Sequence, residues 1–227
     1  FLANAHGKKV AKEATLRTKN LGPRRPSLIY LGPCALATAF FLRRDGGFME
    51  TTSPEGNPGD EVVDLVDESN LVIGKATRRE VRARNLLHRG VGILCTNSTG
   101  RVYVHRRTRT KDIFPGMYDM FVGGVVASGE SAVQAARREI LEELGIVGPE
   151  PKHLFNHLYL GPRNRTWVAV YEVEWDGPIR HQESEVEWGA YLSFREIIEK
   201  IQEWEFVPDG LEIFYRLLEE RRGKASE

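Results

Sequence analysis

The chain has 227 residues, 41% of them hydrophobic, and a formal net charge of zero at pH 7. A chain of this length and composition buries one sizeable core, so we expect one domain with extensions rather than several domains. Only two cysteines occur, Cys34 and Cys95, which argues against a disulfide framework and favours a reducing compartment such as the cytoplasm. Because Cys95 lies in an apolar run, we interpret it as a core residue rather than a nucleophile.

The first 48 residues differ in charge from the rest of the chain. They hold nine basic and two acidic residues, a net charge of +7, so the totals of 32 and 32 leave 23 basic and 30 acidic residues, a net of −7, after them. The apolar run 28–42 is 15 residues long, which is short of the roughly 20 residues that span a bilayer. We expect no membrane span, and three interpretations of residues 1–48 stay open: a disordered extension, an organelle presequence (plastid or mitochondrion), or an upstream translation artefact before Met49.

Residues 49–60 are rich in Pro, Gly, Ser and Thr, which indicates a linker. We therefore expect the folded domain over residues 61–221, with a tail at 222–227. β-prone runs around polar turns, or with alternating apolar residues, predict strands. These strands are predicted at 61–66, 71–74, 90–96, 101–107, 120–124, 154–160 and 167–175. The intervening segments are predicted as an irregular stretch or short helical turn at 78–87 and a loop at 108–119.

Three helices are predicted. Residues 131–144 combine helix-forming residues with an apolar stripe, and Gly145 follows where a left-handed cap would end the helix. Residues 194–203 are capped by Ser193, with Glu196 at the capping-box position, and residues 210–221 form a final amphipathic helix. Several strands with two or three helices predict an α/β fold in three layers, with a mixed sheet between helices.

The first of these helices carries the chemistry. Glu139, Glu142 and Glu143 are spaced i, i+3 and i+4, so their carboxylates share one face of the helix. Three carboxylates this close repel one another, and a hard divalent ion together with the Arg138 guanidinium would compensate them. Mg²⁺ suits such a site because it takes oxygen ligands and bridges to substrate phosphates. The alternative is a solvated acidic helix face with an ordinary Glu/Arg pair.

Basic residues precede this helix in a domain that is acidic overall. Arg106, Arg107, Arg109 and Lys111 lie in and just before the predicted loop at 108–119. Lys and Arg are the usual partners of phosphate oxygens, which indicates a diphosphate ester as ligand. The alternative is that these are loop charges that serve solubility.

The stretch from Gly123 to Gly148 contains the pattern G-x5-E-x7-R-E-U-x-E-E-x-G-U, where U is a bulky aliphatic residue. The nine specified positions are met by Gly124, Glu130, Arg138, Glu139, Ile140, Glu142, Glu143, Gly145 and Ile146. This pattern resembles the Nudix box of diphosphate-cleaving hydrolases, and the segment Phe114, Pro115, Gly116 supports the resemblance.

The resemblance implies an α/β/α sandwich and a small-molecule diphosphate substrate. Glu139, Glu142 and Glu143 would ligate Mg²⁺ or Mn²⁺, with the Gly124 carbonyl as an extra ligand, while Glu130 and Arg138 hold the loop and helix in place. Water would attack a phosphorus atom of a nucleoside diphosphate linked to X or a related diphosphate. The general base would be Glu139 or Glu143, with Glu185 from a later loop as a weaker candidate.

Within the family, the run 106–119 resembles the branch that includes isopentenyl-diphosphate isomerase. Against that activity, Gly123 and Val125 stand where the isomerases place a catalytic Cys and a metal-binding His, and only His88 matches the histidines expected before the sheet. The resemblance to this branch implies that Arg107 and Lys111 contact the diphosphate. An isomerase and a catalytically silent nucleotide-binding module stay as alternatives to the hydrolase.

The sequence does not identify X. Tyr118, Trp167 and Trp188 could stack on a base, although each is at least as well explained as a core residue. Nucleic-acid binding is not expected, because the domain is net acidic and has no basic and aromatic stripe. The oligomeric state is open, with a homodimer as one option.

Overall fold

The computed structural model describes residues 39–42, 48–51 and 57–224. The chain divides into two units, Phe1–Ser53 and Pro54–Glu227. In the first unit, β1 (Ala39–Leu42) pairs antiparallel with β2 (Phe48–Thr51), within and just beyond the segment predicted as an extension. The remaining predictions for residues 1–38, Cys34 among them, lie outside the described residues.

The second unit begins with the short helix η1 (Pro58–Asp60) and is built on one sheet. Its strands are β3 (Val62–Val66), β4 (Val72–Thr77), β5 (His88–Thr96), β6 (Val102–Arg107), β7 (Tyr118–Asp119), β8 (Lys152–Leu160), β9 (Arg165–Glu174) and β10 (Val186–Leu192). The order β10-β6-β5-β3-β4 is extended by β9 and β8, with β9 on β5, while β7 pairs with β6. The sheet is mixed, because β9 runs parallel to β5 and the other strand pairs are antiparallel.

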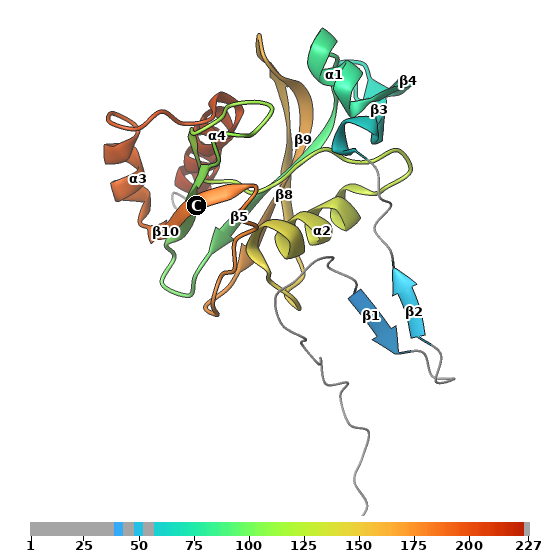
Figure 1. The fold of residues 1–227 in the computed structure, drawn as a ribbon. Coiled ribbons are helices and arrows are strands. Elements are labelled where there is room, and N and C mark those ends of the chain that lie inside the picture. The colour runs from blue at the N-terminus through green and yellow to red at the C-terminus, as the bar shows by residue number, and fades with distance from the viewer. Residues whose placement is uncertain (1–38, 43–47, 52–56, 225–227) are drawn as a thin grey trace, which may run out of the picture. The chain divides into compact units, whose positions relative to one another are not determined.

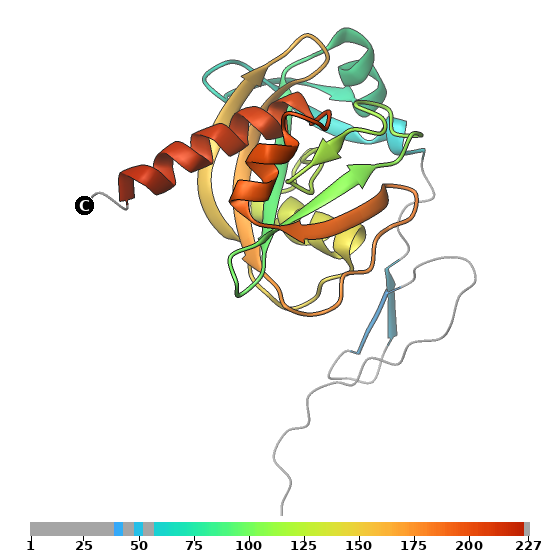
Figure 2. The same ribbon diagram turned by 90° about the vertical axis from the view of Figure 1, so that its left-hand side faces the viewer.

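Helices cover both faces of this sheet. On one face α2 (Ala132–Leu144) packs Ala136 and Ile140 against Val91 and Ile93 of β5. On the other face lie α3 (Phe194–Lys200) and α4 (Pro208–Lys224), which surround Leu94. Figures 1 and 2 show α2 and the α3–α4 pair on opposite sides of the sheet. The predicted α/β/α fold with a mixed sheet is confirmed.

The segment predicted as irregular or a helical turn contains a regular helix, α1 (Arg78–Arg84). Thr77 and Glu80 form a reciprocal capping box, and Asn85 ends the helix in the left-handed conformation at φ 50°. Val81 of α1 packs on Val63 and Val125. α1 is therefore attached directly to the loop that leads into α2.

Two sequence predictions about strands were wrong. Residues 120–124 do not form a regular strand: Val122 and Val125 each pair with β5 through an isolated bridge, and the ladder is interrupted at Gly123 between them. Conversely, β10 forms at Val186–Leu192, where no strand was predicted. It pairs along β6, and its weakly alternating burial explains why periodicity missed it.

Cys95 is 1% exposed, lies in the core under α2 and is a free thiol. The prediction that it is a core residue is confirmed. Among the described residues, no helix is both long and apolar enough to cross a membrane.

Candidate active site

The helix α2 begins and ends at the residues that the sequence predicts. Ser131 caps it through Gln134, and Gly145 ends it in the left-handed conformation with φ 65°. On this helix, Glu139 and Glu143 are 7% and 4% exposed. The side chain of Glu142 is 50% exposed. Two of the three predicted carboxylates are thus buried and the third is exposed.

Arg138 links these carboxylates to the loop before the helix. Its Nε and Nη2 donate to both oxygens of Glu130 at 3.1 Å, and Nη2 also donates to the carbonyl of Val125 at 3.1 Å. Its Nη1 donates to Glu139 at 2.7 Å and to Glu142 at 3.2 Å. Burial acts to lower the pKa of Arg138, but the hydrogen bond to Glu130 and the charge of Glu139 outweigh it and raise the pKa. The guanidinium therefore stays charged and fixes the loop on the helix.

Two glycines allow the loop to pass between β5 and α2. A Cβ at Gly124 would collide with the carboxylate of Glu139, and a Cβ at Gly123 would collide with the backbone carbonyl of Val91. The carbonyl of Gly124 accepts from the N–H of Val91 at 2.9 Å. The backbone of this loop consequently lies directly against the buried carboxylates.

The buried carboxylates are held in an environment that opposes their charge. Burial, and then the neighbouring Glu143, raise the pKa of Glu139 to about 7, although Arg138 acts to lower it. Burial also raises the pKa of Glu143, against the opposing charges of Lys111 and Arg107. Such a pair is stabilised by an added cation.

The oxygen donors fit a hard divalent ion, because three carboxylates and a backbone carbonyl lie within one turn of α2 and the adjoining loop. Among the described residues, however, no three His, Cys, Asp or Glu side chains already converge as a metal cluster. Arg138 Nη1 is bonded to both Glu139 and Glu142. Ligation by those two residues would thus require their side chains to turn away from Arg138.

Basic side chains face the carboxylates from the end of β6 and from the loop after it. The Lys111 ammonium forms an ion pair with Glu185, and Arg107 Nη2 donates to the carbonyl of Ile113 at 3.1 Å. Burial and the charge of Arg107 lower the pKa of Lys111 to about 8, while Glu143 acts to raise it. Lys111 and Arg107 therefore lie within electrostatic reach of the acidic helix.

The other predicted basic residues lie elsewhere in this region. Arg106 donates to the carbonyl of Gly116 at 2.9 Å and pairs with Glu187 at 3.0 Å. Arg109 lies over Gly116, whose φ is 73°. Neither Arg106 nor Arg109 lines the cavity described next.

A cavity of about 100 Å³ lies between the basic loop and the box loop. Gly90 and Gly92 of β5 form part of its floor, and Gly123, Gly124 and Lys111 line the end near α2. Its far end is polar and is lined by buried or half-buried residues, each from a different element or loop. These are Arg82, His88, Asp119, Asn164, Thr166 and Asp209.

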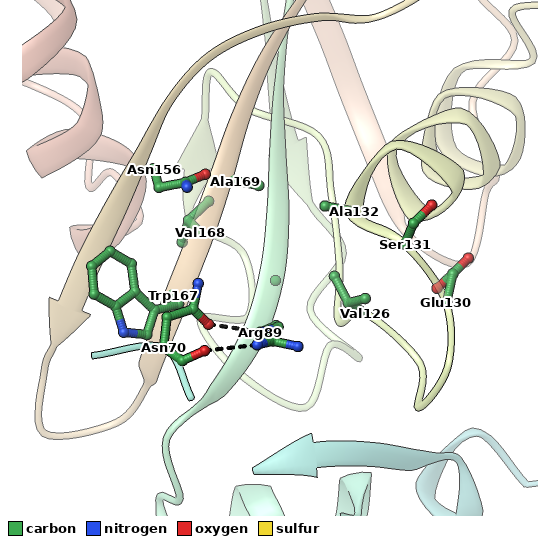
Figure 3. A pocket seen from close by; sticks show the side chains of 11 residues that line it. Asn70, Arg89, Val126, Glu130, Ser131, Ala132, Asn156, Trp167, Val168 and Ala169 are labelled. Atoms are coloured by element: carbon green, nitrogen blue, oxygen red, sulfur yellow. Dashed lines mark hydrogen bonds between the residues drawn. The ribbon is translucent and has the colours of Figure 1, made fainter. Parts of the chain in front are cut away.

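A larger hollow, about 230 Å³, lies beside the amino terminus of α2 (Figure 3). Arg89 is fixed there by hydrogen bonds to the side chain and carbonyl of Asn70, at 2.8 and 2.7 Å, with Trp167 on the same side and Glu130 and Ser131 on the other. None of the box carboxylates on α2 lines this hollow, and neither do the basic residues of the loop. The α2 carboxylates do not line the smaller cavity either, but Gly123 and Gly124, which lie against Glu143 and Glu139, line it together with the basic residues Arg107 and Lys111. The smaller cavity is therefore the candidate active site.

Comparison with known proteins decides the family. The model of the NUDIX domain matches residues 86–216. The chain belongs to the NUDIX family. A Nudix hydrolase of Streptomyces coelicolor, SCO1686, is 51% identical over 160 residues, which cover 70% of this chain and 88% of that protein. The Nudix hydrolase YfcD of Escherichia coli K12 is 42% identical over 153 residues, 66% of this chain and 83% of YfcD.

The fold comparison agrees with this assignment. The crystal structure of DR0079 from Deinococcus radiodurans has a TM-score of 0.61 and 28% sequence identity, and the match covers 69% of this chain and 98% of DR0079. The predicted Nudix resemblance is confirmed, and family membership identifies the protein as a pyrophosphohydrolase. The matched region starts at residue 86 and so leaves out α1.

None of the three aromatic residues predicted as candidates for stacking on a base lines the smaller cavity. Tyr118 stacks on Trp204 with ring centroids 4.1 Å apart, and Trp188 packs edge-on against both. Trp167 lines the larger hollow, where its Nε1 donates to the carbonyl of Asp67 at 3.2 Å.

Sequence reasoning missed the polar end of the cavity. Arg82, Asn164 and Asp209 come from α1, from the turn between β8 and β9, and from the start of α4, and no spacing relates them. A run of arginines at 78, 79, 82 and 84 was the one visible signal, and an exposed helix would show the same run.

Proposed function

We propose that this Nudix hydrolase cleaves the diphosphate bond of a nucleoside diphosphate linked to X, or of a related organic diphosphate, with Mg²⁺ or Mn²⁺. The observation that carries the proposal is charge of both signs at one end of the cavity: Gly123 and Gly124 line it and lie against buried Glu139 and Glu143, and Arg107 and Lys111 line it as well. A diphosphate bound with a divalent ion presents both signs of charge to such a site.

The divalent ion would be held by Glu139, Glu142, Glu143 and the Gly124 carbonyl. When bound, it neutralises charge on the diphosphate and lowers the pKa of the attacking water. Arg107 and Lys111 bind phosphate oxygens and orient the diphosphate. Glu130 and Arg138 act as positioning residues, because Arg138 ties Glu130 to Glu139.

A helix carboxylate is the stronger candidate for the general base. In the metal-free protein the pKa of Glu139 is raised to about 7, which suits a group that accepts a proton near neutral pH. Glu185 is paired with Lys111 instead. Because its carboxylate is held in that ion pair, Glu185 is the weaker candidate.

The position of Gly123 supports a hydrolase over an isomerase. This is where the isomerases of the resembling branch place their catalytic Cys, and a side chain there would collide with Val91. A cytoplasmic location, a homodimer and a catalytic domain at residues 61–221 remain proposals from the sequence.

The test is release of phosphate and nucleotide from a panel of diphosphates, with and without Mg²⁺, by the full chain. Glu142→Gln should lower metal-dependent turnover by at least about a hundredfold, roughly 2.7 kcal/mol of transition-state stabilisation. Glu150→Gln is the matched control, because Glu150 is exposed and pairs only with Arg137 among the contacts described. A folded, metal-binding protein that turns over no diphosphate would contradict the proposal and favour a silent nucleotide-binding module.

A further inference from the structure

The cavity contains buried polar atoms that the described residues leave unsatisfied, and only one of them, on Arg107, belongs to a residue that the proposed reaction uses. Arg82 Nε, Arg107 Nε and Thr166 Oγ1 are buried and have no hydrogen-bond partner among the described residues. All three side chains line the same cavity. Because a buried donor without a partner is unfavourable, their convergence indicates a polar group that enters from outside.

The lining of the whole cavity holds four cations against three carboxylates, Asp112, Asp119 and Asp209. Arg78 and Arg82 of α1 join Arg107 and Lys111 in the lining of the cavity. Burial lowers the pKa of Arg82, and the nearby charges of Arg78 and Arg107 lower it further, against the opposing effect of Asp112. The cations therefore repel one another inside a partly closed space.

A single carboxylate lies between the two α1 arginines. Asp112 Oδ2 is 3.4 Å from Arg82 Nε and 3.7 Å from Arg78 Nη2. These separations are ion pairs without a short hydrogen bond. Asp112 is 42% exposed and lies on the loop next to Lys111, so it can give way to an incoming anion.

Arg82 is oriented toward the cavity from its other side. Its Nη1 donates to Asn164 Oδ1 at 3.1 Å, and Asn164 Nδ2 donates to Asp209 Oδ2 at 2.8 Å. This chain of hydrogen bonds fixes the guanidinium plane and leaves Nε without a hydrogen bond, in the 3.4 Å ion pair with Asp112 alone. A fixed guanidinium whose N–H lacks a hydrogen bond suits a planar or tetrahedral oxyanion.

We propose that Arg78 and Arg82 of α1, together with Arg107, form a phosphoryl-binding subsite, and that the substrate places a phosphoryl group there. The inference rests on the proposed diphosphate chemistry and extends the site to α1, which lies outside the matched NUDIX region. The phosphoryl group has two sources: the diphosphate itself, or a further phosphate on X. The cavity of about 100 Å³ has room for a group of this size.

The first test is calorimetric titration of the full chain with methylenediphosphonate, a non-hydrolysable diphosphate analogue, in Mg²⁺. Arg82→Gln should weaken binding about tenfold or more, since it removes a charged hydrogen-bond donor. Arg79→Gln is the matched control on the same helix, because Arg79 is 63% exposed and pairs with Asp60. Binding to Arg82→Gln within about twofold of the unmodified protein, with no change in the hydrolysis test below, would overturn the subsite.

Asp112→Asn keeps the proposal testable if Arg82→Gln fails to fold. It removes the competing charge while keeping the side-chain shape, so it should tighten binding of the same probe about threefold or more. Unchanged or weaker binding by a folded Asp112→Asn protein would contradict the subsite.

Hydrolysis of matched substrate pairs distinguishes the two sources. NADH and NADPH differ by one phosphate on X, as do dephospho-coenzyme A and coenzyme A. An equal loss of kcat/KM in Arg82→Gln for both members assigns the subsite to the diphosphate, and a loss confined to the phosphorylated member assigns it to X. Arg82-dependent binding without hydrolysis would uphold the subsite and refute the hydrolase, whereas hydrolysis with no Arg82 dependence in either assay would do the reverse.

Discussion

Replacement of Arg138 by Met should destabilise the metal-free protein strongly. The substitution removes five hydrogen bonds, to Glu130, Glu139, Glu142 and the Val125 carbonyl. The Glu130 and Glu139 side chains are only 17% and 9% exposed, so two largely buried carboxylates lose their cation. Loss of one partner from such a buried network costs about 3–5 kcal/mol.

The expected fall in the midpoint of thermal unfolding is about 6–20 °C, at about 2–4 °C per kcal/mol for a protein of this size. Circular dichroism of the chelator-treated protein measures it. Excess Mg²⁺ should reduce the difference in unfolding midpoint between Arg138→Met and the unmodified protein, because a cation at Glu139 and Glu142 replaces part of the positive charge of Arg138. Glu130 would still lack a cation.

Arg137→Met is the matched control for this experiment. Arg137 precedes Arg138 on the same helix, is 52% exposed and pairs with Glu150, which is 69% exposed. An exposed pair contributes about 0–1 kcal/mol. If the two variants differ by less than about 1 kcal/mol in the absence of metal, the view of Arg138 as the compensating charge of the box is wrong.

Three further outcomes follow from the site. Burial, and then a neighbouring aspartate, raise the pKa of Asp119 from 3.8 to about 8. Between these pH values the folded protein retains a proton that the unfolded chain loses, so the free energy of unfolding should fall as pH rises through this range. In urea denaturation, Asp119→Asn should make this dependence of stability on pH shallower. Gly124→Ala should displace Glu139 and weaken Mg²⁺ binding about 10–100-fold by calorimetry. Lys111→Met should lower kcat/KM for diphosphates about tenfold or more, mainly through KM, and an unchanged KM would remove Lys111 from the substrate site.

The acidic half of the site could be predicted because its residues are local in sequence. Helix geometry alone brings Glu139 and Glu143 together, and the motif spacing adds Glu130 and Arg138. The capping signal at Gly145 then places the carboxyl-terminal end of the helix. In this part of the chain local sequence and tertiary structure agree, so the prediction of α2 needed no knowledge of the rest of the fold.

The far end of the cavity could not be predicted, because it is assembled by the sheet. Arg82 and Asn164 are 82 positions apart and meet only because β9 lies parallel to β5. The missed strand β10 has a related cause. Glu185 and Glu187 give the segment the composition of a loop, yet each pairs with a basic residue of the β6 region, Lys111 and Arg106 respectively.

Two groups of charges at the site share an electrostatic problem that an ion and a diphosphate solve together. On α2, behind the Gly123–Gly124 backbone that lines the cavity, burial raises the pKa of Glu139 and Arg138 is the compensating cation. In the cavity lining, burial lowers the pKa of Lys111, and Asp112 is shared between two arginines. A divalent ion supplies charge to the first group and phosphoryl oxygens supply it to the second. We infer that the ion and the diphosphate bind cooperatively, since each removes the repulsion that would oppose the other.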